Sequence, residues 1–244
     1  MSKINIYQIF HQPELAALLD PAFLPFDHCD YTEQNPETSN LLREWPILRD
    51  IGYKRAVEDK ADVWGFVSYK FQEKTNLIGQ QFIDFINDNP DNDVWFMEPR
   101  YVPANPFMNP WVQGDMFHPG ISSIANHIIK VDGQSIDVRK IPMPLCWYNF
   151  FAGTEIFWQK WFSIVDAMLS IADRDPAFKK VLLETGPEHR GETTTPYFIF
   201  VIERLFPTLL SVTEIKYAGL HYRHNDFNVP ADSIFETINA LYKH

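Results

Sequence analysis

Apolar residues form two kinds of run along this chain. Some runs are short, nearly continuous and rich in β-branched or aromatic residues, as buried strands are. Others place apolar residues three and four positions apart, which gives a helix one buried face. The predicted strands are residues 4–10, 62–68, 93–97, 145–152 and 213–220. The predicted helices are residues 39–59, 75–87, 120–130, 154–171, 176–184, 196–210 and 232–242.

Strands that alternate with helices predict an α/β fold, with a mostly parallel sheet and helices on both faces. Polar residues mark several helix starts, because their side chains can accept hydrogen bonds from the first free N–H groups. Ser39, Thr75, Thr154 and Asp232 stand at such positions, and Pro46 marks the start of the first helix or a kink in it.

A proline-rich segment interrupts this alternation at residues 99–120, which we predict to be a loop. Loops of about 20 residues are uncommon inside a compact domain and often serve as lids or binding loops. The tip of this one, residues 110–118, mixes aromatic side chains with polar ones, among them Asp115.

Composition narrows the class of protein. The 244 residues are 45% hydrophobic and 15% aromatic, which excludes a disordered chain and is enough for one domain over residues 1–244. A net charge of −11 argues against a nucleic acid partner. The two cysteines, Cys29 and Cys146, suit a reducing compartment. No apolar stretch approaches the ~18 residues of a membrane span and no secretory leader is present, so we expect a cytoplasmic protein.

Common catalytic motifs are absent from the sequence. It contains no G-x-G-x-x-G, G-x-x-x-x-G-K-[ST], H-E-x-x-H or G-x-S-x-G, so dinucleotide, P-loop, zincin and hydrolase-elbow chemistry have no support. Residues 91–93 read Asp-Asn-Asp, a pair that could hold Mg²⁺ or Mn²⁺ on a diphosphate. The pair precedes a strand rather than following one, so we expect a solvated turn and no metal ligands there.

Polar residues gather where the predicted strands end. In parallel α/β sheets ligands bind at this carboxyl edge, which here would collect residues 8–11, 68–70, 98–100 and 149–153. Lys70 could hold a diphosphate or a carboxylate as a flexible point charge. For the residues of the first two strand ends, Gln8 to His11 and Ser68 to Lys70, the alternative is that they are ordinary polar residues that face solvent.

Two more features have open interpretations. Glu203 and Arg204 lie in an otherwise apolar helix, where a charged pair must be partly desolvated and needs partners. A buried ion pair and a site carboxylate are equally compatible with this. Residues 221–224, His-Tyr-Arg-His, follow a strand and are expected to be an exposed loop.

Three ordered blocks resemble a bacterial family of small GT-A-type glycosyltransferases from capsule and lipopolysaccharide clusters. The first block joins residues 41–44 to 62–71, Asp-Val-Trp-Gly-Phe-Val-Ser-Tyr-Lys-Phe, where the family has Tyr-x-Gly-Leu-x-His-Tyr-Arg-Arg. Residues 147–154, Trp-Tyr-Asn-Phe-Phe-Ala-Gly-Thr, resemble the family's Tyr-Asn-Met-Phe block. Residues 196–205 resemble its Gly-Phe-x-x-Glu-Arg-Leu helix.

The resemblance implies a GT-A-like α/β/α sandwich with a mixed sheet. It implies transfer of a sugar from a nucleotide-sugar donor to a glycan or lipid-linked glycan acceptor in surface polysaccharide synthesis, at the inner face of the membrane if the protein is peripheral. The resemblance leaves open whether the enzyme uses Mg²⁺, Mn²⁺ or no metal ion.

The resemblance also suggests roles for individual residues. Those expected to bind the donor are Lys70 and Arg100 at the phosphates, Gln8, His11, Ser68 and Tyr69 at the nucleotide, and Asn149 and Gly153 near the sugar. For an inverting enzyme the general base would be Asp115, with Glu203 as second choice.

Two other function classes remain. A non-catalytic nucleotide- or glycan-binding module on the same fold would bind a nucleotide-sugar without turning it over. A structural interaction protein would use its aromatic surface for a partner, and no nucleotide would stabilise it.

Overall fold

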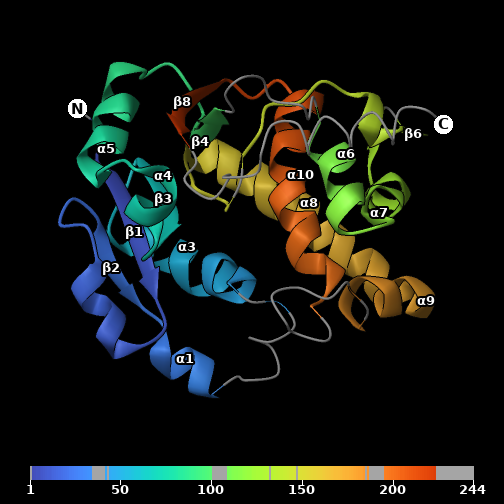
Figure 1. Ribbon diagram of the computed structural model, residues 1–244, viewed down its shortest axis with the longest axis horizontal. Coiled ribbons are helices and arrows are strands. Elements are labelled where there is room, and N and C mark those ends of the chain that lie inside the picture. The colour runs from blue at the N-terminus through green and yellow to red at the C-terminus, as the bar shows by residue number, and fades with distance from the viewer. Residues whose placement is uncertain are drawn as a thin grey trace, which may run out of the picture.

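Six strands form the central sheet of the computed structural model, in the order β2-β1-β3-β7-β4-β8 (Figure 1). The pairs β2–β1, β1–β3 and β4–β8 are parallel, whereas β7 is antiparallel to both of its neighbours, β3 and β4. The predicted α/β class with a mostly parallel sheet is therefore confirmed. The structure describes residues 2–34, 42, 44–100, 109–131, 133–146, 148–184, 186 and 195–223.

The elements have the following bounds. The strands are β1 (Ile4–Phe10), β2 (Leu24–Asp27), β3 (Val63–Ser68), β4 (Val94–Arg100), β5 (Lys130–Val131), β6 (Gln134–Ser135), β7 (Phe151–Thr154) and β8 (Tyr217–Arg223). The α-helices are α1 (Cys29–Gln34), α3 (Tyr53–Glu58), α4 (Phe71–Thr75), α5 (Gly79–Asp88), α6 (Pro110–Phe117), α7 (Ile121–Ile128), α8 (Glu155–Arg174), α9 (Pro176–Lys179) and α10 (Tyr197–Val212). Shorter turns are the 3-10 segments η1 (Pro13–Leu18) and η3 (Val138–Lys140) and the π segments η2 (Ile47–Gly52) and η4 (Lys180–Glu184).

Each face of the sheet has its own core, because successive strand residues point to opposite sides. On one face Val63, Val67 and Trp95 pack with Phe71 of α4 and Phe82 of α5. The other face packs against helices that include α8 and α10, through Trp64, Phe66, Val94 and Phe96 among others. The sheet is therefore the middle of three layers.

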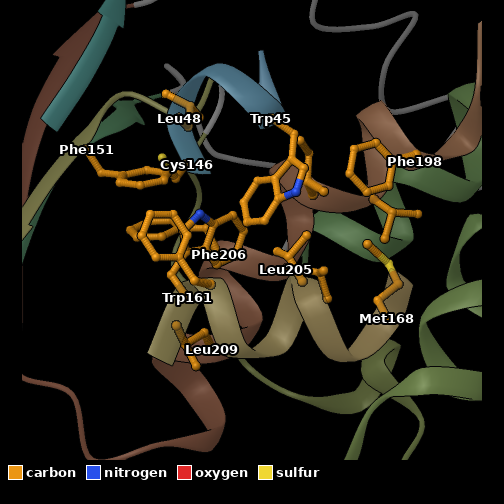
Figure 2. Close-up of a cluster of buried hydrophobic side chains, with 14 of the residues drawn as sticks. Trp45, Leu48, Cys146, Phe151, Trp161, Met168, Phe198, Leu205, Phe206 and Leu209 are labelled. Carbon is orange, nitrogen blue, oxygen red and sulfur yellow. The ribbon is translucent and has the colours of Figure 1, made fainter. Parts of the chain in front are cut away.

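Stacked aromatic rings hold the second face in place. Trp64 of β3 stacks on Trp158 of α8 with ring centroids 4.1 Å apart, and Phe151 of β7 stacks on Phe206 of α10 at 4.3 Å. Trp161 of α8 lies edge-on to both Phe151 and Phe206 (Figure 2). Offset aromatic pairs of this kind stabilise a core beyond the area they bury. These contacts hold α8 against β3 and β7, and they hold α10 against β7.

Strand β7 fits between β3 and β4 because β3 has a glycine, Gly65, at the point where it approaches the backbone of β7 most closely. A Cβ atom on Gly65 would lie 2.3 Å from the Phe151 carbonyl oxygen and 2.7 Å from the Ala152 Cα, both of which are backbone atoms. The pair Gly65–Ala152 is in register in the ladder. Glycine is therefore required at position 65 for steric reasons.

Several predicted boundaries were wrong. The apolar run 145–152 is a strand only from Phe151, because Tyr148 and Asn149 have left-handed backbone conformations that break an extended chain. Thr75 does not cap the helix after it. Its hydroxyl donates to the Phe71 carbonyl, so it ends α4 instead, and Asn76 follows with a positive φ.

The proline-rich segment also differs from the prediction where the structure describes it. Strand β4 continues through Pro99 to Arg100, and residues 110–117 form α6 rather than a loop. The Asn109 side chain caps α6 by accepting from the backbone N–H groups of Trp111 and Val112, and Pro110 occupies the first helical position, where no N–H is needed. The predicted helix at 232–242 lies outside the described residues.

Replacement of Gly65 by alanine should destabilise the protein. The added methyl group meets backbone that cannot move without disrupting the β3–β7 ladder, and overpacking of this kind costs about 1–3 kcal/mol. For a chain of this length that is a fall in melting temperature of roughly 2–12 °C, measured by calorimetry.

Gly219→Ala in β8 is the matched control. Its Cβ would approach the Glu98 carboxylate oxygen, at 2.5 Å, which can move because it ends a flexible side chain. Its melting temperature should change little. An unchanged melting temperature in Gly65→Ala would contradict the assignment of β7 to this position.

Candidate functional site

Five of the six strands end at the same edge of the sheet, because they run in one direction. The carboxyl ends of β1, β2, β3, β4 and β8 all reach this edge, and β7, which runs the other way, begins there. Ligands of α/β sheets bind at this carboxyl edge. It brings together two groups of polar side chains, one beside β1 to β3 and one beside β4 and β8, with the start of β7 between them.

The first group consists of His11, His28, Tyr69 and Lys70, and we call it the lysine–histidine group. The His11 ring lies 6.0 Å from the His28 ring and 5.8 Å from the Tyr69 ring, between centroids. The Lys70 ammonium lies 5.7 Å from the centroid of the Tyr69 ring. Burial lowers the pKa of His28, and the interaction with His11 lowers it further.

Lys70 is half-buried and, among the described residues, makes no ion pair with a carboxylate. A cation without a carboxylate partner at a sheet edge can hold an anionic ligand.

Gln8 and Ser68 help to build this edge. Gln8 is 1% exposed; its amide donates to the Ser68 carbonyl at 3.2 Å and accepts from the Asp20 N–H at 2.7 Å. The Ser68 hydroxyl accepts from the Lys70 N–H at 3.2 Å. Both side chains therefore fix the backbone that carries Lys70. Contact of either with a nucleotide remains a prediction.

The chain enters β7 in a strained conformation. Tyr148 has φ of 66° and Asn149 has φ of 54°, values that non-glycine residues adopt at a cost. The Asn149 side-chain oxygen is buried and has no hydrogen-bond partner among the described residues. The Lys74 ammonium lies 3.7 Å from the centroid of the Tyr148 ring. Backbone strain and an unpaired buried acceptor, both between the two polar groups, mark Asn149 as a candidate ligand contact.

The second group consists of Glu98, Cys146, Glu203 and His221, and we call it the acidic group. Glu98 of β4 and His221 of β8 are register partners, with 3.4 Å between Glu98 Oε2 and His221 Nδ1. Burial raises the pKa of the Cys146 thiol, and the negative charges of Glu203 and, to a lesser extent, Glu98 raise it further. Two carboxylates from different elements therefore act on one buried thiol.

Only part of this second group is predictable from the sequence. Glu203 is a candidate general base there and residues 98–100 are expected at the carboxyl edge, but no motif assigns a role to Glu98. His221 lies in β8 rather than in a loop, which corrects the prediction for residues 221–223. Strand β8 starts and ends later than predicted, and the parallel β4–β8 register that brings Glu98 to His221 has no local signature in the sequence.

Gly153 and Asp115 lie outside these two groups. Gly153 is at the opposite edge of the sheet, because β7 is antiparallel, and a Cβ there would lie 2.3 Å from the Phe157 ring; its position is explained by packing. Asp115 lies in α6, where its two carboxylate oxygens accept from the Ser122 N–H at 3.1 Å and hydroxyl at 2.5 Å. That contact anchors the start of α7. Arg100 ends β4 at the carboxyl edge.

Arg204 shows how its helix is docked. The side chain is 7% exposed and donates to the Pro110 carbonyl at 2.9 Å, the Phe200 carbonyl at 2.8 Å and the Gln113 side-chain oxygen at 2.6 Å. Burial lowers its pKa, and the charges of Glu203 and Asp115 act in the opposite direction. Arg204 therefore fastens α10 to α6, chiefly through neutral oxygens.

The described residues contain no group of three His, Cys, Asp or Glu side chains placed to bind a metal ion, and the residues after β3 are Tyr69 and Lys70 rather than carboxylates. Asp93 stands at the amino end of β4, where its carboxylate accepts from the Lys216 N–H at 3.0 Å. Its role there is to join β4 to the start of β8.

A cavity of about 310 Å³ lies apart from this edge, between α7, α8 and α10. Its lining is largely apolar and includes Ile164, Met168 and Leu209, with Lys130 as its charged residue. None of the predicted site residues lines it. In the part of the chain that the structure describes, no helix has both the length and the apolar character needed to cross a membrane.

Comparison with known proteins gives one distant likeness. No protein-family model and no curated protein sequence matches this chain. Among solved structures, the apo structure of the bifunctional glycosyltransferase WbbM is similar over 91% of this chain and 46% of its own, with 11% sequence identity and a TM-score of 0.40. This chain thus spans about half of that protein, and the likeness is too distant to establish a shared fold or activity.

Proposed function

We propose that this protein transfers a sugar from a nucleotide-sugar donor to a hydroxyl group of a glycan or lipid-linked glycan, on a GT-A-like fold. The observation that carries the proposal is Asn149, whose buried side-chain oxygen lacks a partner among the described residues and lies at the carboxyl edge between the two polar groups. A sugar hydroxyl is a donor that would satisfy it. An unpaired buried acceptor costs about 1–3 kcal/mol, which a ligand would recover.

The lysine–histidine group fits the nucleotide part of such a donor. The ammonium of Lys70 would neutralise the diphosphate that leaves when the sugar bond breaks, a role for which a positioned cation suffices. The rings of His11 and Tyr69 lie next to it and offer flat surfaces and hydrogen-bonding groups for a base or ribose. His28, which is buried, lies beside His11, with 6.0 Å between their ring centroids. Arg100, which ends β4, is the second candidate cation.

The spacing of the strands fits a ligand that spans both groups. Strands β3 and β4 are separated only by β7, so their ends lie roughly 10 Å apart. A diphosphate at Lys70 would place its sugar near Asn149, and beyond it Glu98, Glu203 and His221 would face the acceptor.

Replacement of Lys70 by alanine should weaken nucleotide binding about tenfold to a hundredfold, because loss of a charge-assisted contact costs ~1.5–3 kcal/mol. The melting temperature should stay nearly constant, since no described hydrogen bond or ion pair depends on the Lys70 side chain. Calorimetric titration with the most strongly bound nucleoside diphosphate measures the effect. Lys54→Ala on α3, which removes the same charge from a side chain that is 77% exposed, is the control and should bind as the wild type does. Equal affinity in Lys70→Ala would transfer the phosphate role to Arg100.

Replacement of Asn149 by glycine should separate stability from function. Glycine adopts a φ of 54° without strain and removes the unpaired acceptor, so the free energy of unfolding should rise by on the order of 1 kcal/mol while donor turnover falls. Asn76→Gly is the matched control, because Asn76 has a φ of 57° but an exposed side chain. It should gain stability without loss of turnover. A stabilised Asn149→Gly with full activity would remove Asn149 from the site.

The function itself is tested by incubating the purified protein with a panel of nucleotide-sugars and measuring release of the nucleoside diphosphate. Transfer to water or to added oligosaccharides would support the proposal. A nucleotide bound at 100 times its dissociation constant should stabilise the protein by roughly 2.7 kcal/mol. Stabilisation without turnover would instead favour a nucleotide-binding module, and no stabilisation by any nucleotide would contradict both.

A further inference from the structure

Glu98 and His221 form a carboxylate–histidine pair at the carboxyl edge. They lie directly across from each other on the parallel strands β4 and β8, and 3.4 Å separates Glu98 Oε2 from His221 Nδ1. The carboxylate is the more buried member, with 28% of its side chain exposed, against 42% for the imidazole. The histidine therefore has one ring nitrogen facing the carboxylate and enough exposed surface for the other nitrogen to reach a substrate.

The backbone leaves room for this pair at one position. Gly219 lies two residues before His221 on the same face of β8, and a Cβ there would lie 2.5 Å from Glu98 Oε2. The Glu98 carboxylate thus occupies the space that a side chain at position 219 would take. The pair Phe96–Gly219 precedes Glu98–His221 in the ladder, so the glycine sits directly beside the carboxylate that it admits.

Glu98 supplies negative charge beside the histidine. Burial raises the pKa of the Cys146 thiol, and the charges of Glu203 of α10 and of Glu98 raise it further. A carboxylate beside an imidazole fixes the ring orientation and stabilises the imidazolium that forms when the ring takes a proton. Asp115, in contrast, already accepts two hydrogen bonds from Ser122.

We propose that His221 is the general base that activates the acceptor hydroxyl and that Glu98 is the residue that positions it; this inference rests on the proposed sugar transfer. The acceptor proton passes to His221 Nε2 while the acceptor oxygen bonds to the anomeric carbon of the donor. The bond from that carbon to the phosphate oxygen breaks, and its electron pair leaves with the nucleoside diphosphate. The product is a glycoside of inverted configuration and an imidazolium held by Glu98.

The test compares single variants on the nucleotide-sugar that the wild-type protein turns over best. His221→Ala should lower kcat by about 10²- to 10⁴-fold, the usual contribution of general base catalysis, with unchanged melting temperature and unchanged affinity for the nucleoside diphosphate. Added imidazole should restore part of the rate. His127→Ala, which removes an exposed histidine of α7, is the control and should keep the wild-type rate.

Glu98 is tested through its position as well as its charge. Glu98→Gln should lower kcat, and Gly219→Ala should lower it too, because the new methyl group displaces the carboxylate without a large effect on folding. The Gly219→Ala variant keeps both His221 and Glu98. A lower kcat in this variant would therefore result from the changed position of the Glu98 carboxylate relative to His221.

The outcomes separate this inference from the proposed function. If the wild-type protein turns over no nucleotide-sugar, both fail. If it does and His221→Ala keeps the rate, or loses it together with nucleotide affinity or thermal stability and without rescue by imidazole, the general base assignment is overturned while sugar transfer stands. Wild-type kcat in Gly219→Ala or Glu98→Gln would overturn the positioning role of Glu98.

Discussion

The reversed strand β7 is the constraint on which the rest of this structure depends. It is bonded to β3 on one side and to β4 on the other, and it is the link between the parallel strands β2, β1 and β3 and the parallel pair β4 and β8. Its fit requires Gly65 on β3, whose missing side chain lets the Phe151 carbonyl approach. Because β7 runs backwards, its first residues arrive at the edge where its neighbours end, and α8 begins at the opposite edge.

The direction of β7 also organises the chemistry of that edge. It inserts Asn149, with its left-handed backbone and buried amide oxygen, between a group that carries a lysine and a group that carries carboxylates. Although the chain has a net charge of −11, a cation, Lys70, lies at this edge, where it could hold an anionic leaving group. The separation of cation and carboxylates by one strand suits a ligand with a phosphate at one end and a reacting hydroxyl at the other.

The elements that sequence predicts well are those whose pattern is local. The apolar run before Ser68 is strand β3, and the helical spacing of residues 120–130, 154–171 and 196–210 matches α7, α8 and α10 within a few residues. The run 145–152 failed because apolar content alone cannot show that Tyr148 and Asn149 turn left-handed. The repeated prolines around Asp115 predict a loop, although Asn109 and Pro110 are good residues for a helix start.

The sequence predicts where in the fold the candidate site lies, but it does not predict which of the site residues contact one another. The end of β3 predicts Tyr69 and Lys70 at this edge, because parallel strands share a carboxyl edge. Asn149 lies there for another reason, since it precedes β7, which runs the other way. Gly153 was misplaced since nothing in the sequence reveals that β7 runs backwards. The pairing of Glu98 with His221 depends on the register of two strands far apart in the chain, which periodicity does not encode.

The central claim is that the donor sugar is held at the start of β7. A crystal structure of the protein with an intact nucleotide-sugar tests this claim most directly. The donor should lie along the carboxyl edge, with its diphosphate at Lys70 and a sugar hydroxyl donating to the Asn149 side-chain oxygen at about 2.7–2.8 Å. A donor bound elsewhere, such as in the cavity between α7, α8 and α10, with Asn149 still unpaired, would contradict the account.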